Sequence, residues 1–78
     1  MSLTVDHHLE ASGLLCPEHV MMLHNKVRDM VEGQVLRMVA TDPSSMRDIP
    51  KFCSYLGHVL LAQTEEEGEY IYLIKKGS

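Results

Sequence analysis

Apolar residues in the segment that follows Pro17 recur every three or four positions, which is the spacing of one face of an α-helix. The residues of this face are Val20, Leu23, Val27 and Met30. Proline is favoured at the first helical position, because its fixed φ suits a helix and its missing N–H has no partner there. Gly33 supplies a stop signal. The pattern predicts a helix from residue 17 to about residue 31, with Cys16 at its N-cap.

Residues 35–41 are apolar on both alternating faces, which is typical of a strand buried within a sheet. A second helical stripe follows and ends at Gly57; its members are Met46, Ile49, Phe52, Cys53 and Leu56. Pro50 interrupts this stripe, and a proline beyond the first helical turn removes a hydrogen bond. The second helix therefore begins either near Asp48 as its N-cap, or near Ser45 with a tolerated defect.

Residues 59–63 and 69–75 read as two strands of a hairpin with a charged turn at 65–68, and residues 8–11 form a weaker first strand. The predicted order is βαβαββ. Two short helices cannot cover both faces of a four-stranded sheet, so we expect both on one face, in a two-layer α/β (α+β) sandwich. Tyr70 and Tyr72 share one side of the last strand, and we place them on the open face.

Length and composition fit one small globular domain spanning residues 1–78, with 45% hydrophobic and 23% charged residues. The net charge of −4 argues against stable direct binding to nucleic acid. No apolar stretch approaches the roughly 20 residues that span a bilayer, and the first residues lack the pattern of a signal peptide. We therefore expect a cytoplasmic protein that does not engage membranes.

The two cysteines are expected to be free thiols in a reducing cytosol, although a disulfide between them remains open. Cys53 belongs to the second helical stripe and should be buried as a small hydrophobe. Cys16 at a helix N-terminus would tend toward the thiolate, because free N–H groups and the helix dipole stabilise negative charge. Gly13 allows an unusual backbone turn that would expose Cys16. The alternative is that Cys16 is merely a small capping residue.

His19 follows Cys16 by three residues and is the second candidate for chemistry. It could pair with the thiolate, shuttle a proton or join Cys16 as a metal ligand; the alternative is a solvated histidine of the first turn. A zinc site needs four ligands, and this pair supplies two. We therefore predict no metal and no other cofactor. The sequence shows no Gly-rich phosphate loop and no Ser/His/Asp order, so hydrolysis and phosphoryl transfer have no support.

Several segments together resemble the TusA/SirA-like family of small bacterial sulfur carriers. They are residues 9–17 (LEASGLLCP), 42–44 (DPS), 47–53 (RDIPKFC), 57–58 (GH) and 70–77 (YIYLIKKG). The likeness covers nearly the whole chain, in order. It implies a βαβαββ sandwich with a mixed four-stranded sheet, like the C-terminal domain of translation initiation factor three.

The resemblance also implies a function for Cys16, which matches the family's cysteine. It would accept sulfur as a persulfide from a cysteine desulfurase and pass it to a downstream relay protein, as a sulfurtransferase-type carrier rather than a self-sufficient catalyst. In the branch that this chain resembles most, the relay ends in 2-thiolation of the wobble uridine of transfer RNA. Other branches supply molybdenum-cofactor enzymes or sulfur oxidation. We expect a monomer that forms transient complexes.

One residue departs from the family's Cys-Pro-x-Pro pattern, because His19 replaces the second proline. The change restores one N–H in the first turn and adds a group that titrates near neutral pH. A possible modulator of Cys16 therefore stands at this position. The alternative function is a redox- or metal-sensing regulatory module that uses Cys16 and His19.

Overall fold

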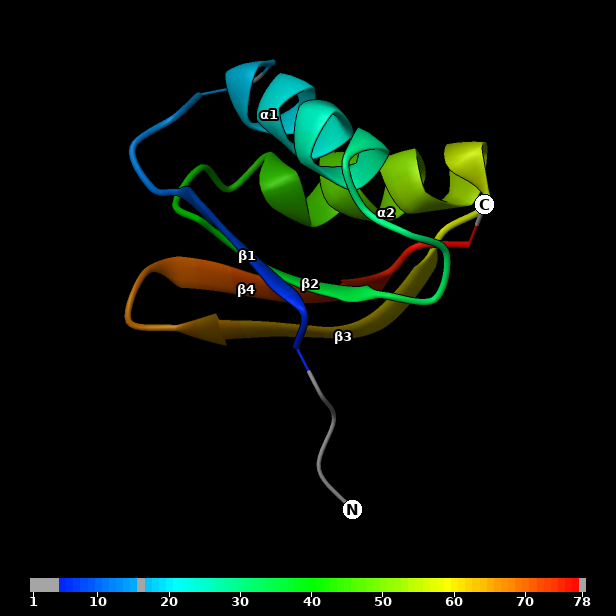
Figure 1. The fold of residues 1–78 in the computed structure, drawn as a ribbon. Coiled ribbons are helices and arrows are strands. Elements are labelled where there is room, and N and C mark those ends of the chain that lie inside the picture. The colour runs from blue at the N-terminus through cyan, green and yellow to red at the C-terminus, as the bar shows by residue number, and fades with distance from the viewer. Residues whose placement is uncertain (1–4, 16, 78) are drawn as a thin grey trace.

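The computed structural model describes residues 5–15 and 17–77. Its elements follow the predicted order and are β1 (His7–Ala11), α1 (Glu18–Arg28), β2 (Val35–Ala40), α2 (Ser45–Leu56), β3 (Val59–Glu66) and β4 (Glu69–Lys75). The sheet order is β1-β2-β4-β3; β1 and β2 are parallel, and the other neighbouring pairs are antiparallel. Both helices lie over the same face (Figure 1), which confirms the two-layer sandwich with a mixed sheet.

The core fills the space between the sheet and the two helices. Its buried members are Leu9, Ala11, Leu23, Val27, Met30, Leu36, Met38, Ala40, Ile49, Cys53, Tyr72 and Ile74. The apolar face predicted for the first helix supplies Leu23, Val27 and Met30, while Val20 packs at the edge of the core. Of the second stripe, Ile49 and Cys53 are buried, whereas the end members Met46 and Leu56 are exposed.

The placement of the two tyrosines on the open face was wrong. Tyr72 is fully buried beneath the helices, and Tyr70 packs against the same core. Tyr72 pairs with Met38 across the sheet, and partners in register share a face, so both side chains point into the core. The tyrosine can be buried because its hydroxyl lies 2.6 Å from the hydroxyl of Ser45, which satisfies both groups.

The first helix begins one residue later and ends three residues earlier than predicted. Pro17 is its N-cap rather than its first helical residue, so the prediction of Cys16 as N-cap is corrected. At the other end, the N–H of Asp29 bonds to Lys26 and that of Met30 to Val27, which are the tighter i to i+3 bonds of a helix end. This tight turn keeps Met30 in the core although the α-helix has ended.

The second helix begins at Ser45, so the alternative with a tolerated Pro50 is confirmed. Ser44 is the N-cap, and Gly57 ends the helix in the left-handed conformation with φ of 77°. Strand β3 runs three residues further than predicted, because Glu65 and Glu66 pair with β4 instead of forming the turn. The hairpin turn is formed by Glu67 and Gly68, both at positive φ.

Candidate functional site

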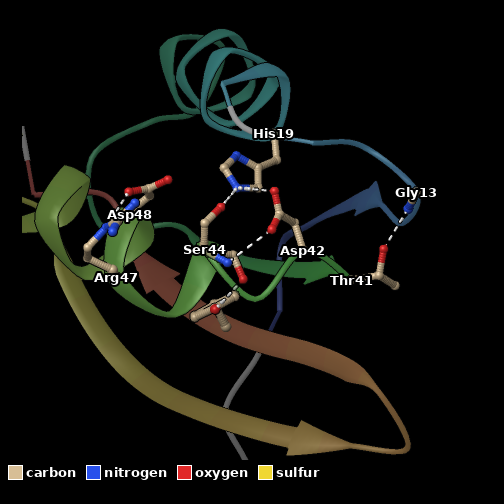
Figure 2. Close-up of polar contacts among 9 residues, drawn as sticks. Gly13, His19, Thr41, Asp42, Ser44, Arg47 and Asp48 are labelled. Carbon is tan, nitrogen blue, oxygen red and sulfur yellow. Dashed lines mark hydrogen bonds and ion pairs between the residues drawn. The ribbon is translucent and has the colours of Figure 1, made fainter.

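The segment around Cys16 joins β1 to α1. Cys16 itself lies outside the described residues, but both of its chain neighbours are exposed, Leu15 at 67%. Gly13 has a φ of +82°, so the unusual turn expected there is present. Its N–H donates to the hydroxyl oxygen of Thr41 at 2.8 Å, which ties this loop to the end of β2 (Figure 2).

His19 is fully buried, so the alternative of a solvated first-turn histidine is wrong. Figure 2 shows its ring lying between α1 and the loop that joins β2 to α2. The ring atom Nε2 lies 3.5 Å from the hydroxyl of Ser44 and 3.9 Å from a carboxylate oxygen of Asp42. Among the described residues, the other ring nitrogen, Nδ1, has no hydrogen-bond partner. The helix thus places an imidazole in a buried polar cluster.

The loop that receives His19 has its own fixed geometry. The N–H of Ser44 donates to the carboxylate of Asp42 at 3.0 Å, and the N–H of Ser45 donates to the carbonyl of Asp42 at 2.9 Å. These bonds hold the Asp42 side chain, which is 15% exposed, beside the ring. The sequence indicated this loop as a turn and as part of the family likeness, but no local signal links it to a histidine 23 residues earlier. Its role beside His19 was therefore missed.

A wide, mostly apolar hollow of about 850 Å³ lies between the two helices. Its lining residues are Pro17, Val20, Met21, His24, Asn25, Asp48, Lys51, Phe52, Tyr55 and Leu56. Tyr55 is 90% exposed and Met21 is 60% exposed, so the hollow carries large side chains with little cover in the isolated chain. The groove between the helices begins at Pro17, the residue after Cys16. Apolar surface of this kind is typical of protein contact sites.

Basic side chains from outside the two helices lie near the C-terminal ends of these helices. Lys76 donates from Nζ to the carbonyl of Met30 at 2.7 Å, just beyond the end of α1, where carbonyl groups lack helical partners. Nearby, His58 accepts a hydrogen bond at Nδ1 from the N–H of Gly77 at 3.1 Å. Burial, with the neighbouring charges of Lys76 and His24, lowers the pKa of His58. These hydrogen bonds account for the positions of Lys76 and His58 near the helix ends, so the two residues have a structural role there.

Cys53 is 2% exposed and lies in the core, which confirms its predicted burial. Desolvation raises the pKa of its thiol to about 11, so the thiolate is disfavoured at neutral pH. Residues 5–15 and 17–77 contain no group of three or more histidine, cysteine, aspartate or glutamate side chains placed to hold a metal ion. Within the same residues, no helix is long and apolar enough to cross a membrane.

The architecture belongs to a known class of small α+β sandwiches. The crystal structure of a SirA-like protein from Desulfitobacterium hafniense superposes with a TM-score of 0.81 at 20% identity, covering 92% of this chain and 99% of that one. At this identity, the match shows the fold alone. It agrees with the mixed sheet and the pair of helices on one face.

The family follows from the sequence comparisons. The model of the family described as sulfurtransferase TusA matches residues 7–76, so the chain belongs to this family. The sulfur carrier protein TusA of Pseudomonas syringae pv. syringae is 60% identical over 77 residues, covering 99% of this chain and 92% of that protein. That of Pseudomonas savastanoi pv. phaseolicola is 61% identical over 75 residues, covering 96% and 89%. Membership supports a sulfur carrier role and contacts with sulfur-transfer partners.

Proposed function

We propose that Cys16 accepts sulfane sulfur from a cysteine desulfurase as a persulfide and passes it to a downstream relay protein. The relay ends in 2-thiouridine formation at the wobble position of transfer RNA. The observation that carries this proposal is the identity of about three residues in five with sulfur carrier proteins over nearly the full chain. Cys16 and Pro17 match the cysteine motif of the family that the sequence resembles.

The transfer is an exchange between thiols and needs no cofactor. The thiolate of Cys16 attacks the outer sulfur of the donor persulfide, the donor S–S bond breaks, and the donor cysteine leaves as a thiolate. Cys16 then carries the outer sulfur as its own persulfide. Cys53 does not compete, because its buried thiol holds its proton and cannot reach a partner.

The apolar groove between the helices supports the partner part of the proposal. It begins beside Pro17, so a protein seated there would lie next to the segment that carries Cys16. A carrier must leave one partner for the next, which requires small, exchangeable contacts. We therefore propose a monomer of one domain, residues 1–78, that forms transient complexes in the reducing cytoplasm.

Intact-protein mass spectrometry tests the first transfer. The protein is incubated with a cysteine desulfurase, cysteine and pyridoxal phosphate, and wild type is compared with Cys16→Ser and Cys53→Ala. We expect a gain of one sulfur mass in wild type and Cys53→Ala and none in Cys16→Ser. Sulfur retained by Cys16→Ser would refute the assignment of the carrier residue.

A second stage tests the destination of the sulfur. Loaded wild-type protein is mixed with the downstream relay proteins and transfer RNA, and 2-thiouridine is measured after digestion. Sulfur that reaches a molybdenum-cofactor enzyme or a sulfur-oxidising protein instead would refute the transfer RNA destination. If no variant gains sulfur while the isolated protein retains a stoichiometric metal, the sensing module that uses Cys16 and His19 replaces the carrier function.

A further inference from the structure

A small basic pocket lies where the end of α1 meets the turn after α2 and the C-terminal segment. Its volume is about 230 Å³, and its lining residues are His24, Val27, Arg28, Leu56, His58 and Lys76. Within residues 5–15 and 17–77, every titratable residue of this lining is basic. His24 and Arg28 lie one turn apart on the same side of α1. Figure 1 shows the C-terminal segment ending beside the end of α2, and the fold thereby adds His58 and Lys76 to this side of α1.

Three of the basic side chains are held by hydrogen bonds and keep further donors. Arg28 donates from Nη2 to a side-chain oxygen earlier on α1 at 2.8 Å, and Lys76 donates from Nζ to a carbonyl beyond the end of α1 at 2.7 Å. A guanidinium has five N–H groups and an ammonium has three, so one such bond leaves most of their donors for solvent or a ligand. His58 accepts at Nδ1 from a backbone N–H, so its neutral ring carries the proton on Nε2 and is a donor there.

The positive charge of the pocket exceeds what the end of α1 requires. The carbonyl groups at the end of a helix carry roughly half a negative charge. Arg28 and Lys76 alone bring two positive charges to this place. Asp29 and Glu32, the acidic residues that follow in the chain, are exposed and do not line the pocket. Neutralising the helix end therefore explains only part of the basic cluster.

The pKa of His58 indicates the same excess of positive charge. It is lowered first by burial and then by the charges of Lys76 and His24, so another positive charge is disfavoured here. Like charges that share a site repel one another, and an opposite charge among them removes the repulsion. An anion in the pocket would also accept charge-assisted hydrogen bonds from several lining donors at once. The pocket thus has the chemistry of an anion site.

We propose that this pocket binds a tetrahedral oxyanion of the phosphate or sulfate class, held by Arg28 and Lys76 with His24 and His58 as further donors. The pocket is smaller than the roughly 300–1,000 Å³ of pockets that hold drug-sized ligands, so an ion fits it better than a large molecule. The net charge of −4 also disfavours a polyanion such as nucleic acid.

The oxyanion site is separate from the start of α1 and goes beyond the proposed carrier function. Pro17, the residue after Cys16, caps the beginning of α1, whereas Arg28 is its last residue. The 11 residues of the helix span roughly 16 Å at about 1.5 Å each. Binding at this end can therefore be measured without any sulfur transfer.

Amide NMR spectra recorded during titration with sodium sulfate or sodium phosphate test the site. Sodium chloride keeps the ionic strength constant, so that general screening is the same at every point. We expect saturable shifts at the lining residues of the wild-type protein. Arg28→Gln and Lys76→Gln should each lower the affinity about tenfold, which is the loss expected when one charge-assisted hydrogen bond is removed.

Lys26→Gln is the matched control, because it removes the same charge from the same helix outside the pocket lining. An equal loss of affinity in this variant would overturn the proposal, since the attraction would then come from the net charge of the protein. Wild-type shifts that grow without saturation, or that spread over the whole surface, would overturn it as well. This second criterion does not depend on any variant being folded.

The titration of His58 gives another measurement on the unmutated protein. The basic groups that share the pocket with it are His24 and Arg28 from α1 and Lys76 from the C-terminal segment, while α2 contributes the apolar Leu56. A bound anion stabilises the imidazolium, so sulfate should raise the midpoint of the His58 titration relative to chloride at equal ionic strength. An unchanged midpoint would contradict a bound oxyanion.

A third ligand separates the two sources of such an anion. Short single-stranded RNA of mixed sequence carries phosphate groups on a polymer, whereas inorganic phosphate is free. We expect inorganic phosphate to shift the lining residues without RNA. RNA that shifts these residues while free phosphate and sulfate leave them unchanged would overturn the proposal of a small-anion site.

Discussion

The hydroxyl oxygens of Tyr72 and Ser45 lie 2.6 Å apart, and both side chains are fully buried. The bond joins β4 to the first residue of α2, across the interface between the sheet and the helices. Burial raises the pKa of the Tyr72 phenol, which keeps the hydroxyl protonated and able to share the bond. Because Ser45 directly follows the loop that carries Asp42 and Ser44, this bond also anchors the surroundings of His19.

Removing one partner of this pair should destabilise the fold. Tyr72→Phe leaves the buried hydroxyl of Ser45 without its partner, so we expect a loss of about 1–3 kcal/mol in the free energy of unfolding. Ser45→Ala strands the phenol and should cost a similar amount. The double variant should lose less than the sum, since neither hydroxyl is then orphaned. Urea unfolding of the four proteins measures the cycle, and strictly additive losses would contradict a direct bond.

The sequence predicted the order and type of every element, because the helices carry apolar residues at helical spacing and the strands are apolar or alternating runs between turn residues. The side of β4 that faces the core could not be deduced in this way. Ile71 and Leu73 are as apolar as the tyrosines on the other side, so the alternation alone does not indicate which side of the strand faces the core. The partner that decides it, Ser45, lies 27 residues earlier and is an ordinary turn residue in the sequence.

The candidate site was predicted only in part, because some of its contacts also join residues that are far apart in the sequence. Cys16 and His19 are linked by local spacing, which a sequence displays. The burial of His19 depends on Asp42 and Ser44, which α1 meets only after the chain has passed through β2.

Pro50 shows why helix propensity alone could not fix the start of α2. A helix that also packs Ile49 and Cys53 into the core gains more than one lost hydrogen bond costs.

The stability of the protein should fall at alkaline pH through Cys53. Its folded-state pKa is raised from 9.0 to about 11, so the unfolded thiol ionises first. The stabilisation that comes from the protonated Cys53 thiol is complete below pH 9. It is lost as the pH rises from 9 to about 11, since the unfolded state then binds fewer protons than the folded state. Chemical denaturation of wild type and Cys53→Ala should show a difference that changes across this window. Comparing the two removes the contribution of Tyr72, which is common to both.

A difference between wild type and Cys53→Ala that stays constant from pH 8 to about 11 would contradict the burial of the thiol. The variant itself should be less stable at neutral pH, because removing the buried sulfur leaves a small cavity.

The bond between Gly13 and Thr41 should stabilise the loop before Cys16. Thr41→Val keeps the shape of the side chain but removes the hydroxyl that accepts from the Gly13 N–H. We expect a loss of about 0.5–1 kcal/mol in the free energy of unfolding, because the bond lies in an exposed loop where water can replace it. Thr41→Ser is the matched control, since it retains the acceptor. Equal stabilities of the valine and serine variants would show that the bond is absent in solution.

His58 should make the protein less stable in mild acid. Its pKa is lowered in the folded state, by burial first and then by Lys76 and His24. Its stabilising contribution is therefore present above the unfolded pKa of about 6.5 and is lost as the pH falls through that value toward the folded pKa. His58→Asn keeps an oxygen that can accept from the Gly77 N–H but cannot take a proton. Relative to this variant, wild type should lose stability between pH 7.5 and 5 in thermal or urea unfolding. Parallel stability curves of the two proteins over that range would contradict the lowered pKa of His58. They would mean that His58 binds a proton equally well in the folded and unfolded chains.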